Sequence, residues 1–173
     1  MTATRYAFAA LVVACGLGAG AMVRIAHGQP TPTHGAAPAE EGKRVFTRAN
    51  CIGCHKWHGG GGGGYGGAAL SLRNTELTRE QIIETVNCGR PGAGMPYFLR
   101  DAYDGKHCSS LTKQDLEGNM PPESPVFLRT SEIAAVADYV ITHIKGRGEP
   151  TYPECIEFFG PGSRVCNTHK KEE

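Results

Sequence analysis

The chain has 173 residues, 40% of them hydrophobic, and a formal net charge of +1 at pH 7. This length suits one domain of ordinary size with additional segments. The balanced charge gives no reason to expect a nucleic acid or an acidic substrate as a partner. The 24 glycines do not indicate a fibrous protein, because eight of them fall between Gly59 and Gly67.

Residues 1–28 have the pattern of an export signal. A short basic start precedes an apolar run of 18 residues, Tyr6 to Val23, and Ala26 and Gly28 place small residues before a cleavage site. We therefore expect a cleavable secretory signal peptide. An uncleaved membrane anchor and a lipid anchor on Cys15 stay open as alternatives. In each case the functional domain lies outside the cytoplasm, as in a bacterial periplasm.

The next segment is expected to link this signal to the folded domain. Residues 29–38 are rich in proline, alanine and threonine, which is typical of a disordered spacer. From Ala39 to Asn50 the apolar residues recur at helical spacing. Gly42 lies four residues before Phe46, on the same face of this predicted helix. A glycine in that position lets another helix approach closely.

The sequence Cys51-Ile52-Gly53-Cys54-His55 is the attachment signature of c-type haem. The two thiols add across the two vinyl groups of the porphyrin, and His55 can then bind the iron. A thioredoxin-like site would need a βαβ pattern that this chain lacks, and a zinc site would need a second ligand pair. We predict one covalently attached haem c, bound by Cys51 and Cys54 with His55 as an iron ligand.

Six consecutive glycines, Gly59 to Gly64, follow the motif. Glycine lets the backbone lie close to a ligand, so the tract predicts a loop on the His55 side of the haem. A carbonyl in this loop could accept a hydrogen bond from the His55 ring and fix its tautomer. A flexible linker is the alternative. Trp57 and Tyr65 are expected to pack on the haem or to bind a propionate.

A short helix is predicted from Leu77 to Asn87. Thr78 and Gln81 match a capping box, and Leu77 can pack on Ile82 as a hydrophobic staple. A glycine-rich turn follows this helix and leads to Gly-Met-Pro-Tyr-Phe.

A low-spin haem carrier needs a second axial ligand, and a methionine raises the reduction potential relative to a second histidine. Met95 follows the helix and the glycine turn, and Pro96 restricts its backbone to extended geometry. Met120, in Asn-Met-Pro-Pro, is the alternative ligand. His107 is a third option that no motif supports. Arg90 is expected to bind a propionate or to form a surface salt bridge.

Four cysteines outside the leader and the motif, an even number, suit two disulfides in an exported protein. They allow three pairings. We favour the two local closures, Cys88–Cys108 and Cys155–Cys166. The first would hold the loop that contains Met95, and the second would fold the tail into a cap.

An insertion and a last helix complete the domain. Residues 99–125 form the insertion, in which residues 111–116 suggest one or two helical turns. The apolar pattern of residues 129–144 predicts a helix, and we expect its Tyr139 to lie near Gly42. Its apolar stripe consists of Ile133, Val136, Ala137, Val140 and Ile144.

The helix that runs into C-x-x-C-H and a last helix of the form E-I-A-A-V-A-D-Y-V resemble the class I, mitochondrial-type c cytochromes. The resemblance covers residues 39–98 and 126–144. It implies an all-α fold in a domain over residues 39–147, with these two helices crossing beside the haem edge. The family's methionine ligand lies in an M-P-x-F-like loop, which Met95 matches. The glycine tract, the insertion and the tail, residues 148–173, depart from the family.

The resemblance implies a periplasmic carrier of single electrons, not an enzyme, between redox proteins such as a dehydrogenase and a terminal oxidase. Membrane association could come through the N-terminal segment. The stretch G-R-P-G-x-G-M-P-Y-F also resembles cytochromes that serve quinoprotein (PQQ) alcohol dehydrogenases. One alternative is therefore a subunit of a larger oxidoreductase. A catalytic or sensing haem with a labile sixth ligand is another.

Overall fold

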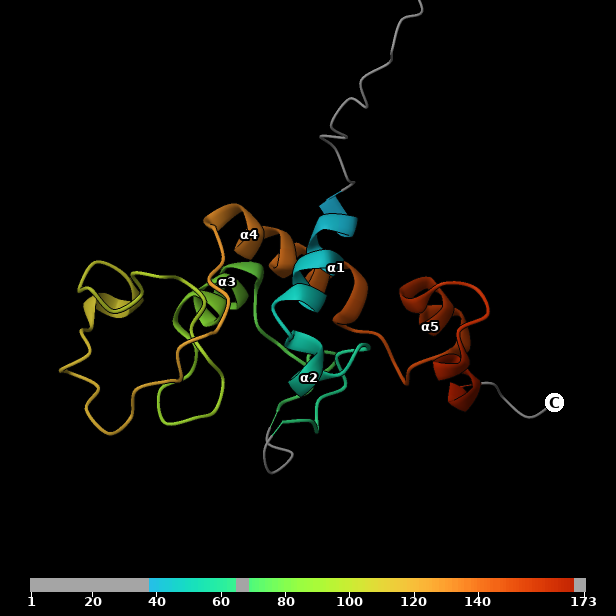
Figure 1. The fold of residues 1–173 in the computed structure, drawn as a ribbon, viewed down its shortest axis with the longest axis horizontal. Coiled ribbons are helices and arrows are strands. Elements are labelled where there is room, and N and C mark those ends of the chain that lie inside the picture. Colours follow the sequence, from blue (N-terminus) through green and yellow to red (C-terminus); the bar gives the residue numbers. More distant parts are fainter. Residues whose placement is uncertain (1–37, 65–68, 170–173) are drawn as a thin grey trace, which may run out of the picture. The chain divides into compact units, whose positions relative to one another are not determined.

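The computed structural model describes residues 38–64 and 69–169, and its regular elements are helices (Figure 1). The α-helices are α1 (Pro38–Arg48), α2 (Cys51–His55), α3 (Arg79–Cys88), α4 (Thr130–Tyr139) and α5 (Tyr152–Phe159). Among the described residues, η2 (Cys108–Ser110) and η4 (Arg164–His169) are 3-10 helices, and η3 (Val140–Ile144) is a π-helix. Within the described ranges the extended segments make only isolated bridges. The predicted signal peptide lies outside the described residues.

The helices α1 and α4 cross in direct contact, with α1 upright and α4 running across it in Figure 1. Gly42 of α1 lies at this contact, where a Cβ atom would overlap the carbonyl oxygen of Ala135 and sit 2.5 Å from the Tyr139 Cβ. The rings of Phe46 and Tyr139 pack with centroids 5.7 Å apart. The predicted helix pair and the role of its glycine are confirmed.

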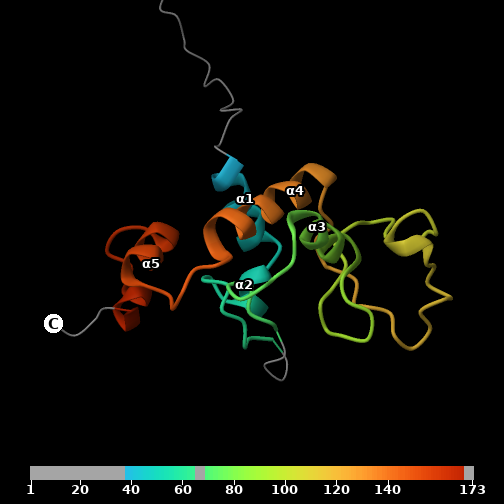
Figure 2. The ribbon, with the colours of Figure 1, turned by 180° about the vertical axis from the view of Figure 1, so that it is seen from behind.

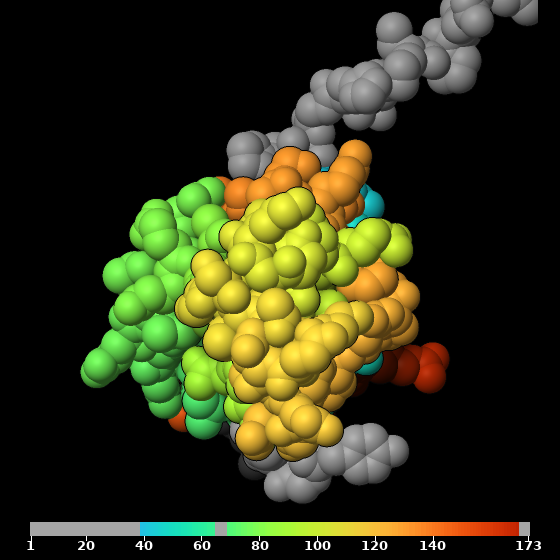
Figure 3. All heavy atoms as spheres, turned by 90° about the vertical axis from the view of Figure 1, so that its left-hand side faces the viewer, coloured from blue at the N-terminus to red at the C-terminus, as the bar shows by residue number. Residues whose placement is uncertain are grey.

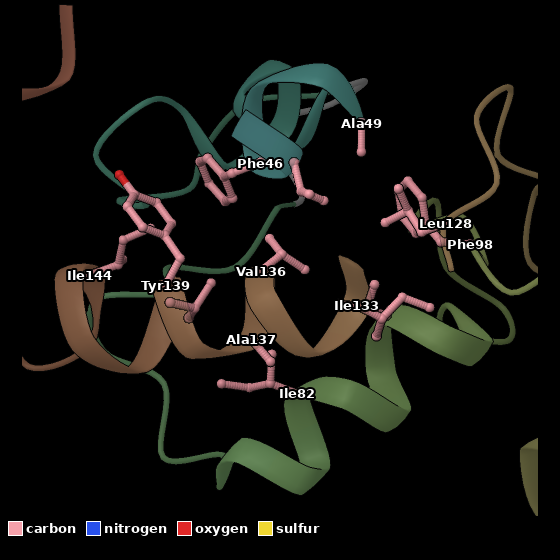
Figure 4. Close-up of a cluster of buried hydrophobic side chains, with 13 residues drawn as sticks. Phe46, Ala49, Ile82, Phe98, Leu128, Ile133, Val136, Ala137, Tyr139 and Ile144 are labelled. Carbon is pink, nitrogen blue, oxygen red and sulfur yellow. The ribbon is translucent and has the colours of Figure 1, made fainter. Parts of the chain in front are cut away.

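The core is built on α4, which lies between α1 on one side and α3 on the other (Figure 4). Phe46 and Val136 fill the first interface, and Ala137 and Ile82 fill the second (Figure 4). Burial of such side chains is worth roughly 1.5–3 kcal/mol each. At its C-terminal end α4 continues into the wider π-helix η3, which ends with the buried Ile144.

The start of α3 is capped as predicted. Thr78 accepts a hydrogen bond from the Gln81 backbone N–H at 3.3 Å, and Gln81 Oε1 accepts one from the Thr78 N–H at 2.9 Å. Two N–H groups without a partner inside the helix are satisfied in this way. α3 therefore begins where the sequence predicts it and places Cys88 at its last position.

The insertion, residues 99–125, dominates the face of the molecule shown in Figure 3. The prediction of helical turns over residues 111–116 is wrong. Thr112 donates to Asp115 Oδ2 through both its backbone N–H, at 2.7 Å, and its hydroxyl, at 2.6 Å. With the bond from the Asp115 N–H to Thr112 Oγ1 at 3.4 Å, these are the reciprocal bonds of a helix start, but the chain continues in turns over residues 113–119, and Gly118 has a φ of 81°. The helical turn in this region is η2, Cys108–Ser110, in which all three residues have positive φ.

The tail folds into the helices α5 and η4 (Figure 2). The disulfide Cys155–Cys166 joins these two helices. Arg73 attaches it to the rest of the domain. Its buried guanidinium donates to the Arg147, Gly148 and His58 carbonyl oxygens and to both oxygens of the Glu154 carboxylate. All three nitrogens of this guanidinium donate hydrogen bonds, which stabilises a fixed arrangement, since the planar group loses little freedom on binding.

Glu132 is a buried carboxylate at the start of α4. It accepts from the Arg129 backbone N–H at 2.9 Å, from Arg129 Nε at 3.2 Å and from Arg48 Nη2 at 2.5 Å. The hydrogen bond from the Arg129 side chain and the nearby positive charges hold the pKa of Glu132 below its usual value, against the effect of burial. The ionised carboxylate thus links α4 to the end of α1.

We predict that Gly42→Ala destabilises the holoprotein by about 1–3 kcal/mol, because a Cβ atom would overlap the backbone of α4. Urea unfolding measures the loss. Gly148→Ala is the matched control, since a Cβ there meets open space, and its effect should stay within about 0.5 kcal/mol. Equal stabilities of the two variants would contradict the close contact.

We predict that Glu132→Gln lowers the free energy of unfolding by about 1–3 kcal/mol at neutral pH. The folded-state pKa of Glu132 is depressed, so its stabilisation is present above the unfolded-state pKa and is lost as the pH falls through the folded-state pKa. The difference between wild type and variant should therefore shrink in acid. Urea unfolding at pH about 7 and about 3.5 tests this. A constant difference would contradict the assignment.

Candidate functional site

α2 presents two thiols and a histidine on little more than one helical turn. Asn50 and Lys56, which flank it, both have positive φ, of 57° and 62°. Cys51 and Cys54 are three positions apart, so they share a face, and neither forms a disulfide. Burial raises the pKa of the Cys51 thiol to about 12, so this thiol is protonated at neutral pH. The helix therefore offers two free thiols side by side.

The His55 ring is fixed by a backbone carbonyl. Its Nδ1 lies 2.9 Å from the Leu70 oxygen, and because a carbonyl only accepts, Nδ1 carries the proton. Burial lowers the pKa of His55, the bond to Leu70 opposes this, and the Arg90 charge lowers it further. The imidazole is therefore neutral, with its Nε2 lone pair available to a metal. The predicted carbonyl acceptor is confirmed.

The glycine tract closes on the end of α2. The Gly61 N–H donates to the His55 oxygen at 3.2 Å, and the Gly63 N–H donates to the Cys54 oxygen at 3.0 Å. The Gly62 N–H donates to the Ala69 oxygen at 2.8 Å. Carbonyls at the end of a helix lack partners inside it, and the tract supplies them. The alternative of a flexible linker is wrong for Gly59 to Gly64, whereas Tyr65 lies outside the described residues.

Gly61 shows why this loop needs glycine. Its φ is +74°, and a Cβ atom there would lie 2.5 Å from the Ala69 oxygen and 2.7 Å from the Leu70 carbonyl carbon. Only glycine adopts that conformation without strain and lets the two backbone segments touch. The carbonyl that orients His55 is in place because of this contact.

Trp57 lies against the tail. Its ring lies 5.8 Å from Phe158, 5.7 Å from Phe159 and 5.3 Å from His169, measured between centroids. No pattern in the sequence predicted that side chains of the tail would pack on this ring. Trp57 therefore joins the motif loop to α5 and η4.

Met95 belongs to a loop, residues 89–97, that we name the methionine strap. The two ends of the strap touch, since the Arg90 N–H donates to the Met95 oxygen at 3.1 Å. A Cβ atom at Gly89 would lie 2.7 Å from the same oxygen. Met95 packs against the core cluster that Cys51 of α2 also contacts. The strap and the motif thus border one cluster.

The two rival ligands lie in the insertion. Met120 packs against a second cluster, formed around the disulfide and including Tyr97 and Tyr103. His107 Nε2 lies 3.4 Å from the Asp101 carboxylate. Met120 is not among the apolar side chains that pack on the cluster that Cys51 borders.

Arg90 is exposed, and among the described residues its side chain has no ion-pair partner. The alternative of a surface salt bridge therefore has no support. The Arg90 charge reaches His55 electrostatically and lowers its pKa.

Both predicted disulfides form. Cys88–Cys108 and Cys155–Cys166 join cysteines whose Cα atoms are 5.5 Å apart. Because Cys88 is the last residue of α3, the first disulfide ties the start of the strap to the insertion.

A family model described as Cytochrome c matches residues 39–143, from α1 to η3. The chain belongs to the cytochrome c family. Comparison with curated protein sequences and with solved structures gave no match. The cytochrome carries covalently bound haem c and is an electron-carrying protein, and its predicted all-α fold and cofactor are confirmed.

The residues of α2 and its loop fit haem c. Cys51 and Cys54 are free to form thioethers, and His55 keeps Nε2 unengaged. At Gly64 a Cβ atom would lie 3.2 Å from Cys54 Sγ, so a side chain there would crowd the thiol. When bound, haem c supplies an iron that cycles between Fe(II) and Fe(III).

Cytochromes of this family usually lie outside the cytoplasm in bacteria. Across residues 38–64 and 69–169, no helix is both long and apolar enough to cross a membrane.

Two elements of the site escaped the sequence analysis. Arg73 follows Leu72 with no motif to distinguish it, although a buried arginine holds the tail in place. Tyr103 lies in the insertion, yet its hydroxyl bonds to the carbonyl of Cys88. Long-range contacts of this kind have no local pattern that could reveal them.

We predict that Gly61→Ala destabilises the cytochrome by about 1–3 kcal/mol more than Gly62→Ala. Both glycines have positive φ, +74° and +72°, so the strain of alanine is the same. Only at Gly61 would the new Cβ meet backbone atoms, because at Gly62 it meets the flexible Lys56 Nζ at 3.5 Å. Thermal unfolding of both holoproteins measures the difference, and equal melting temperatures would contradict the packing.

Proposed function

We propose that this cytochrome is a periplasmic monohaem carrier of single electrons, with His55 and Met95 as its two axial ligands. The observation that carries this proposal is that Met95 and Cys51 pack on the same core cluster, whereas Met120 packs on the second cluster. The electrostatic effect of Arg90 on His55 supports the same pairing of strap and motif.

Each proposed ligand is held by backbone contacts. The carbonyl of Leu70 fixes the His55 ring so that Nε2 faces the metal side. The Met95 backbone is held through its oxygen, which accepts from the Arg90 N–H. A thioether is a soft ligand that suits Fe(II) and raises the reduction potential. Two fixed ligands keep reorganisation small when the electron arrives and leaves, and they leave no open position for a substrate.

The two disulfides support a location outside the cytoplasm, where such bonds persist. A cleaved signal peptide over residues 1–28 would deliver the chain there. The electron donor and acceptor would then be other exported or membrane-bound redox proteins, such as a dehydrogenase and a terminal oxidase.

A second candidate function is that of a cytochrome subunit in a larger oxidoreductase, such as a quinoprotein dehydrogenase. The exposed apolar side chains of the tail favour it, because Phe159 is 40% and Val165 54% exposed. Purification of the native protein without affinity tags distinguishes the two. A stable complex with a dehydrogenase supports the subunit, and a lone monomer supports the free carrier.

We predict that Met95→Ala abolishes the weak far-red charge-transfer band that marks methionine ligation in oxidised haem. Met120→Ala, a matched change in the second cluster, should retain the band. Optical spectra of both oxidised holoproteins test this, with a pyridine haemochrome assay to confirm equal haem content. Loss of the band only in Met120→Ala would transfer the ligand to Met120. A wild type without the band, and with high-spin features, would instead favour a catalytic or sensing haem.

A further inference from the structure

We propose that Tyr103 of the insertion is a positioning residue for the sixth iron ligand, because it contacts both ends of the methionine strap. This inference rests on the proposed ligation by Met95. It assigns the insertion a role in setting how fast that ligand leaves the iron.

Tyr103 holds the end of the strap where the chain enters it. α3 ends at Cys88, and the last carbonyls of a helix lack partners inside the helix. The Tyr103 hydroxyl donates to the Cys88 oxygen at 2.5 Å. Both residues are buried, at 5% and 8% exposure, so no water replaces this bond readily. The Cys88–Cys108 disulfide fixes the same residue through its side chain.

The ring of Tyr103 holds the other end, where the chain leaves the strap. It meets the Tyr97 ring edge to face, with centroids 5.4 Å apart and planes at 87°. The Tyr97 hydroxyl donates to Glu123 Oε2 at 2.7 Å. The Tyr97 backbone pairs with the insertion as well, since its N–H donates to the Pro122 oxygen at 3.0 Å and its oxygen accepts from the Ser124 N–H at 3.1 Å.

These contacts reach Met95 through the backbone. The entering end touches the leaving end directly, because the Arg90 N–H bonds to the Met95 oxygen and Gly89 leaves no room for a Cβ atom beside it. The middle of the strap is attached through the Gly92 N–H, which donates to the Asn119 oxygen at 2.8 Å. Motion of either end therefore displaces the backbone that carries the thioether.

The test measures how fast imidazole replaces the methionine in the oxidised holoprotein, and loss of the far-red band follows the replacement. At saturating imidazole the rate is limited by dissociation of the methionine from the iron. Tyr103→Phe keeps the ring and removes the hydrogen bond to Cys88. We therefore expect the far-red band to be present before imidazole is added, and a limiting rate about tenfold higher than that of wild type, a factor of ten being about 1.4 kcal/mol. Tyr139→Phe is the matched control. That buried tyrosine donates no hydrogen bond among the described residues, so its limiting rate should equal that of wild type.

A second control separates positioning from general stability. Gly42→Ala destabilises the domain at the contact of α1 with α4, away from the insertion, and should leave the limiting rate within twofold of wild type, about 0.4 kcal/mol. A rate that rises equally in Gly42→Ala and Tyr103→Phe would overturn the positioning role. So would a Tyr103→Phe rate within twofold of wild type.

If Tyr103→Phe does not accumulate as holoprotein, Tyr97→Leu replaces it, since it removes the ring contact with Tyr103, and its rate is compared with that of Tyr97→Phe, which loses only the bond to Glu123. The same rise is expected, and an unchanged rate contradicts the proposal. A wild type that lacks the far-red band overturns the ligation by Met95 itself. A wild type with the band and an unaffected Tyr103→Phe overturns only the role of Tyr103.

Discussion

The hydrogen bond from the His55 ring to the Leu70 carbonyl is the constraint on which the site depends. It fixes which ring nitrogen carries the proton, and so which one can bind iron. The glycine tract makes this hydrogen bond possible. The chain must turn back within a few residues and lie against α2 to bring the Leu70 carbonyl to the His55 ring. At Gly61 a side chain would force the two segments apart.

The opposite side of the proposed site is held by contacts far apart in the sequence. The strap that carries Met95 is closed on itself by a backbone hydrogen bond and is attached to the insertion at its start, middle and end. The tail is attached near the other loop, through Arg73 and Trp57. The segments that depart from the family pattern therefore support the methionine strap and the loop that carries the Leu70 carbonyl.

Much of this was predictable, because it rests on local patterns. The capping box of Thr78, the contact of Gly42 with α4 and the two short-range disulfides each follow from neighbouring residues or helical spacing. The contacts of Trp57, Arg73 and Tyr103 were not predictable, since each joins segments that only the folded chain brings together. The helical turns expected in the insertion do not form, because the helix start that Thr112 and Asp115 provide is followed only by turns, with Gly118 at a φ of 81°.

We propose that His55 and Met95 hold the iron from both sides, as in an electron carrier. Carbon monoxide binding to the reduced wild-type holoprotein tests it most directly. The account predicts a low-spin, six-coordinate spectrum and slow or no formation of a carbon monoxide adduct at neutral pH. A high-spin reduced spectrum with rapid binding of carbon monoxide would contradict it.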